Sequence, residues 1–84
     1  MDVYLVWQCE YDDAELHGVY LHPQKAEAVV HYLAREYNAV HAVEPDEYPP
    51  MTVGTTSDGF VGYTDIHWNH RVVMSAAHVN EDKE

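Results

Sequence analysis

Three polar side chains in the second half of the sequence are of types that bind metal ions. Asp65, His67 and His70 form the pattern Asp-x-His-x-x-His. One carboxylate and two imidazoles are a ligand set that zinc or another divalent ion accepts. The three residues span an expected turn, however, and two histidines in a loop fix no ligand geometry. A metal- or small-ligand-binding module is therefore an alternative function, and we expect no cofactor.

Carboxylates also gather in two other segments, and each of these segments contains a tyrosine. The first of them, residues 10–15, lacks the ligand spacing of a calcium-binding loop. An aromatic side chain among exposed acids can anchor a protein interface, because it buries a large area at little cost in entropy. The predicted partner-binding residues are Glu10, Tyr11, Asp12, Asp13, Glu15, Glu44, Asp46, Glu47 and Tyr48.

The net charge narrows the classes of partner. Fifteen acidic residues against four lysines and arginines give a formal charge of −11 at pH 7. Such a field repels nucleic acid and anionic membranes and attracts basic protein surfaces. The alternative is that the charge only keeps a small protein soluble.

The sequence offers no catalytic motif. Cys9 is the single cysteine, and its position beside apolar residues of an expected strand predicts that it is buried. The chain has neither a glycine-rich phosphate loop nor a G-x-S-x-G pattern. We therefore predict a protein that is not an enzyme and has no catalytic residues.

The elements that position these side chains begin with a hairpin and a helix. Residues 3–9 alternate as a strand does, the polar segment 11–16 suits a turn, and residues 18–21 resume the strand pattern. Pro23 then opens a helix expected to end near Tyr37, with Asn38 as its cap. Apolar residues at helical spacing predict that one face of this helix packs on a sheet.

The second half adds a loop and further strands. Three prolines place residues 44–50 in an acidic surface loop, preceded by a possible short strand at 39–43. Asp58-Gly59 predicts a hairpin between strands near 51–55 and 60–66. After a turn at 67–69, residues 71–79 form a last strand, and 79–84 make a frayed acidic tail.

The opening unit resembles a family of short, uncharacterised phage and bacterial proteins. The matching residues are Val3-Tyr4-Leu5-Val6, the acidic segment 10–15, Gly18-Val19-Tyr20 and Lys25-Ala26-Glu27. The similarity covers about residues 3–34, and Leu21-His22 stands where that family has a Ser or Thr before the helix. It implies a β–β–α–β domain and a phage origin, without an activity or site residues.

Together these patterns predict one α+β domain, residues 1–84, with an antiparallel sheet of four to five strands and one helix on one face. The other sheet face leaves a homodimer as an option. We expect a cytoplasmic, non-enzymatic interaction protein that is phage-encoded. It would inhibit a host nucleic-acid-dependent defence complex, as anti-CRISPR proteins do, by acidic mimicry of nucleic acid, its partner being a basic host protein.

Overall fold

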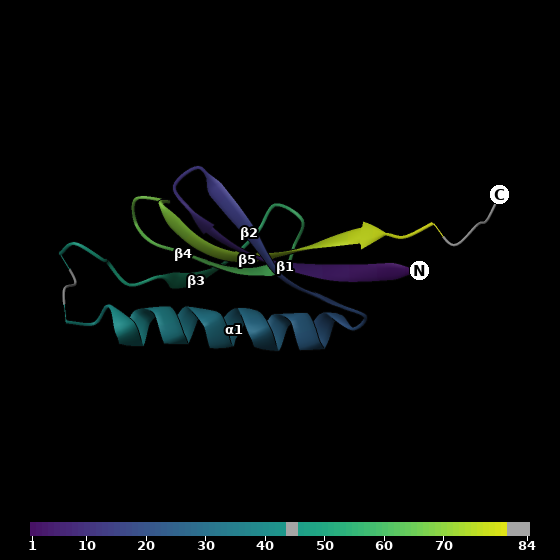
Figure 1. Ribbon diagram of the computed structural model, residues 1–84, viewed down its shortest axis with the longest axis horizontal. Helices are drawn as coiled ribbons and strands as arrows, with labels where there is room; N and C mark the ends of the chain where they lie inside the picture. The colour runs from purple at the N-terminus through teal and green to yellow at the C-terminus, as the bar shows by residue number, and fades with distance from the viewer. Residues whose placement is uncertain (44–45, 81–84) are drawn as a thin grey trace.

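A computed structural model describes residues 1–43 and 46–80, and it confirms the α+β fold, with five strands and one helix (Figure 1). The elements are β1 (Asp2–Glu10), β2 (Asp13–Tyr20), α1 (Pro23–Val40), β3 (Thr52–Thr55), β4 (Val61–Thr64) and β5 (His70–His78). The strands form one antiparallel sheet in the order β2-β1-β5-β4-β3. The first and last strands are therefore central neighbours.

Helix α1 covers one face of this sheet (Figure 1). Its buried residues Ala26, Val30, Leu33 and Ala34 pack with Val6, Met51, Val72 and Met74. Pro23 lies in the first turn of the helix, as predicted, where its missing N–H leaves no helix hydrogen bond unmade. The core is thus built from the helix stripe and from alternate residues of the two central strands.

The register decides which strand residues face away from the helix. Leu5 pairs with Ser75, and Trp7 pairs with Val73, so these side chains share the uncovered face with one another. The hydrogen bond from Trp7 Nε1 to Ser75 Oγ, 3.0 Å long, lies on this face. Tyr4 and Val6 lie instead on the helix side. The homodimer suggested by this apolar face stays a prediction.

The first turn is shorter than the sequence pattern indicates. Only Tyr11 and Asp12 lie between the first two strands, and Asp13 already pairs with Glu10. Tyr11 adopts a φ of 56°, in the left-handed region, which allows the tight reversal. Residues 13–16, expected in the turn, therefore belong to β2.

The end of the helix is the second correction. Helix α1 continues to Val40, and His41 is its C-cap residue, so Asn38 is not the cap. Residues 39–43 complete the helix and turn away from it; they are not a strand. The side chain of Asn38 is used elsewhere, in contacts with Met51.

The loops of interest meet at one end of the sheet. Figure 1 shows the β1–β2 turn, the β4–β5 turn and the end of α1 at the end opposite the N-terminus. A backbone hydrogen bond of 2.6 Å from Tyr11 N–H to the Asn69 carbonyl joins the two turns. The predicted functional segments therefore lie together although they are distant in sequence.

Candidate functional site: an acidic end with a histidine and tyrosine floor

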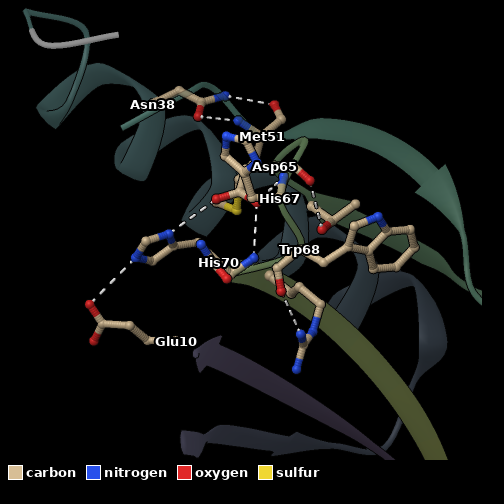
Figure 2. A network of polar contacts seen from close by, with 10 residues as sticks. Glu10, Asn38, Met51, Asp65, His67, Trp68 and His70 are labelled. Carbon is tan, nitrogen blue, oxygen red and sulfur yellow. Dashed lines mark hydrogen bonds and ion pairs between the residues drawn. The ribbon is translucent and has the colours of Figure 1, made fainter. Parts of the chain in front are cut away.

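Asp65 organises the β4–β5 turn. Its Oδ1 accepts hydrogen bonds of 3.0 Å from the backbone N–H groups of His67 and Asn69. Its Oδ2 lies 3.1 Å from Nδ1 of His70 (Figure 2). Asp65 and His70 are both buried. The carboxylate thus shapes the turn and holds the imidazole ring.

His70 links this turn to the end of β1. A carboxylate can only accept a hydrogen bond, so the contact with Asp65 requires the proton on Nδ1 of His70. The other ring nitrogen, Nε2, lies 3.5 Å from Oε2 of Glu10, whose side chain is largely exposed. His70 therefore lies between a buried and an exposed carboxylate.

Five rings form a continuous row beside this group. Their centroids are separated by 4.2 Å (Tyr48–His41), 4.4 Å (His41–Tyr37), 5.2 Å (Tyr37–His70) and 5.3 Å (His70–Tyr11). The Tyr48 and His41 rings are stacked. We call these five residues the aromatic row. It joins the β1–β2 turn, the end of α1, the segment before β3 and the start of β5.

A pair of hydrogen bonds holds the segment before β3 against the helix. Asn38 Nδ2 donates to the Met51 carbonyl at 3.0 Å, and the Met51 N–H donates to Asn38 Oδ1 at 2.9 Å (Figure 2). Met51 is itself buried in the core. This clamp fixes where the chain re-enters the sheet after Tyr48.

A hollow of about 550 Å³ opens at this end of the sheet. Glu10, Asp13 and Glu15 line it, together with the Tyr37, His41 and His70 members of the aromatic row. Arg71 also lines it, and its guanidinium donates to the Trp68 carbonyl at 2.8 Å. Among the described residues, the lining of the hollow thus combines three carboxylates and three rings, two of them imidazoles, with one guanidinium group.

The pKa shifts at the site report its polarity. Burial raises the pKa of Asp65, but hydrogen bonds from His70, Asn69 and His67 outweigh it, so the pKa lies below the ordinary value. Burial, followed by the negative charges of Asp65 and Glu10, raises the pKa of the Tyr37 hydroxyl. That hydroxyl is buried, without a hydrogen-bond partner among the described residues. The surroundings of Tyr37 therefore disfavour a further negative charge.

Most of the predicted partner-binding residues lie at this end. Asp12, Asp46 and Glu47 are exposed, and Glu10 contacts His70. Tyr11 is exposed at one end of the aromatic row, whereas Tyr48 is half-buried against His41. Glu44 lies outside the described residues. We call the six described carboxylates the acidic end: Glu10, Asp12, Asp13, Glu15, Asp46 and Glu47.

The three metal candidates do not converge on one point. Asp65 and His70 are in contact, but the His67 backbone, not its ring, is what Asp65 binds, and His67 is exposed. Within residues 1–43 and 46–80, no group of three or more His, Cys, Asp or Glu is arranged to hold a metal ion. The Asp-x-His-x-x-His pattern therefore builds a turn in this structure.

An Asp–His pair can also hold or transfer a proton during catalysis. In the described part of the chain, the polar contacts of the His70 ring are the carboxylates of Asp65 and Glu10, and no hydroxyl or thiol group bonds to it. Cys9 is buried, as predicted.

Sequence reasoning missed Tyr37, His41 and Asn38 as parts of this site. Tyr37 and His41 are four residues apart, a spacing that places both on one side of a helix. This spacing indicates a shared helix face only if the helix continues beyond Tyr37. Extending the helix by one turn would have indicated that both rings lie together at its end.

Comparisons with family models, with curated proteins and with solved structures found no match to this chain. The resemblance of residues 3–34 to short phage and bacterial proteins stays a prediction. No helix in the described ranges is long and apolar enough to cross a membrane.

Proposed function

We propose that this protein is a non-enzymatic binding protein whose acidic end occupies a basic, nucleic-acid-binding surface of another protein. One observation supports this most strongly: two acidic, tyrosine-containing segments, distant in sequence, meet around His70. Scattered charge would serve solubility equally well, whereas convergence concentrates the field on one face.

The described parts of the two segments are held in place by contacts that solubility does not require. Tyr11 is fixed by its backbone bond to Asn69, and the chain after Tyr48 by the Asn38–Met51 clamp. A pre-positioned surface loses less entropy on binding than a flexible one. Carboxylates held in this way can take the place of phosphates in a basic groove.

A phage-encoded inhibitor of a host nucleic-acid-dependent defence complex is the specific form of this proposal. It rests on the acidic surface and on the resemblance of the first half of the chain. Cytoplasmic location in the host follows from the same proposal.

The test is capture followed by competition. Tagged protein immobilised on a column is exposed to bacterial lysate that contains defence complexes, and bound proteins are eluted with a salt gradient. We expect a nucleic-acid-binding protein to elute at moderate salt, because exposed charge pairs are screened.

The captured protein is then tested for binding to a labelled oligonucleotide. Addition of the acidic protein should displace the oligonucleotide with increasing dose. If nothing is captured, or if the captured protein binds both at once, the mimicry proposal is wrong.

A further inference from the structure

The hollow at the acidic end has the composition of a receptor for a cationic side chain. Its volume, about 550 Å³, lies within the range of small-ligand pockets, roughly 300–1,000 Å³. Glu10, Asp13 and Glu15 supply carboxylate oxygens on its lining, and Tyr37, His41 and His70 supply rings. The lining therefore offers negative charge and ring surface to a single guest group.

These two features together favour guanidinium over ammonium. A guanidinium group is planar, stacks on aromatic rings and donates paired hydrogen bonds to a carboxylate. An ammonium group is a compact, strongly hydrated charge that gains less from a row of rings. We propose that this hollow receives the guanidinium group of an arginine side chain from the partner protein.

Two other charged side chains, Arg71 and Asp65, also affect the charge that a guest in the hollow would meet. Arg71 lines the hollow, but its guanidinium donates a hydrogen bond to the Trp68 carbonyl. Asp65 lies behind His70 and adds negative charge. Burial raises the pKa of Tyr37 most, and the negative charges of Asp65 and Glu10, which raise it further, also favour a cationic guest. The three carboxylates of the lining outnumber its one permanently charged base, Arg71, whose guanidinium already bonds to Trp68.

Glu10 is the residue on which the guest should depend most. Its side chain is 70% exposed and its Oε2 is 3.5 Å from His70 Nε2, so it can bond a guest without leaving the ring. A guest bound there would lie beside His70, which stands between Tyr37 and Tyr11 in the aromatic row. This proposal rests on the proposed function, because it names the group by which the basic partner is recognised.

The experiment uses three small probes with the purified protein at pH 7.5: Nα-acetyl-arginine amide, Nα-acetyl-lysine amide and Nα-acetyl-citrulline amide. Citrulline keeps the shape of arginine without its charge. Binding is followed by shifts of the His70 and Tyr37 ring signals in NMR titrations. We expect the arginine probe to bind with a Kd of about 1–10 mM, as suits a ligand of this size.

The lysine probe should bind more weakly and the citrulline probe should cause no saturable shift. Glu10→Gln should weaken the arginine probe about tenfold, since a charge-assisted hydrogen bond is lost. Asp58→Asn, in the exposed β3–β4 turn, removes the same charge elsewhere and should leave binding unchanged.

Equal binding of lysine and arginine, or no saturable shift with arginine, would overturn the guanidinium proposal. So would an equal effect of Glu10→Gln and Asp58→Asn. None of these results tests the proposed function, which is tested by partner capture and by competition with the oligonucleotide. Conversely, arginine binding without capture of a partner would leave the hollow as a site and remove the mimicry.

Discussion

At the scale of single residues, Asp65 is the side chain on which the site depends. It is 3% exposed and accepts hydrogen bonds from the backbone of His67 and Asn69 and from the His70 ring. Removing its charge leaves these donors with a weaker acceptor. Asp65→Asn should therefore lower the free energy of unfolding by about 1–3 kcal/mol in urea titrations.

A matched control is Asp58→Asn, which removes an equal charge from an exposed turn. That variant should change the free energy of unfolding by less than about 0.5 kcal/mol. If both variants lose the same stability, the hydrogen bonds of Asp65 contribute nothing beyond its charge.

The pH dependence of the free energy of unfolding tests the role of Asp65 in a second way. The pKa of Asp65 is lowered in the folded state, so the unfolded state takes up its proton first as pH falls. The contribution of Asp65 to stability is present above the ordinary aspartate pKa of about 4 and is lost as pH falls through the lower folded value. Unfolding measured between pH 6 and pH 2 should show a steeper loss in the wild-type protein than in Asp65→Asn.

At the scale of elements, the Asn38–Met51 clamp connects the helix to the strand that follows the acidic loop. Asn38→Ala removes both hydrogen bonds and leaves the partly buried Met51 backbone groups unpaired. We expect a loss of about 1–3 kcal/mol in the free energy of unfolding and faster hydrogen exchange at the Met51 amide.

Asn38→Asp is the informative companion variant. It keeps an acceptor for the Met51 N–H but sets a carboxylate oxygen against the Met51 carbonyl oxygen in place of the Nδ2 donor, so the stability should fall while the Met51 amide stays better protected from exchange than in Asn38→Ala. An unchanged Met51 exchange rate in Asn38→Ala would show that the clamp does not hold this segment.

The elements also show what the sequence could and could not predict. Alternation in residues 3–9, Pro23 at the helix start and Asp58-Gly59 in a turn are local signals, and each of these elements formed as predicted. The predicted end of the helix near Tyr37 is wrong, because the side chain of Asn38, the expected cap, bonds instead to Met51, thirteen residues later. The length of β2 was wrong because pairing with β1 outweighs the polar character of residues 13–16.

The site itself was predictable only in pieces. The acidic segments and the histidine turn were recognisable by composition, but the contact of Glu10 with His70 depends on β1 and β5 being neighbours. Glu10 pairs directly with His70 in that register. No local pattern in the sequence indicates the strand order. The sequence alone therefore did not predict that these two segments, which the sheet joins, lie together.

At the scale of the whole molecule, the proposed binding depends on where the charge lies more than on its amount. The chain has a formal net charge of −11 at pH 7, and the proposed function belongs to the part of that charge at the acidic end. Exposed charges contribute little to stability, so they can be neutralised without unfolding the protein. Two variants with equal net charge can therefore separate location from amount.

The most direct measurement compares two triple variants as column baits beside the wild-type protein. The first replaces Asp12, Asp13 and Glu47 at the acidic end by their amides; the second does the same to Asp2, Glu27 and Asp58, which lie outside it. Each variant changes the formal charge from −11 to −8, three carboxylates fewer in both. The amount of the captured nucleic-acid-binding protein is measured at each step of the salt gradient.

We predict that the first variant loses at least about tenfold in affinity for that protein, while the second retains wild-type binding within about twofold. Thermal unfolding should show all three baits folded. Equal loss in both variants would mean that the charge acts without regard to position, and equal retention would mean that the acidic end is not the binding surface. Either of these results would contradict the proposed function.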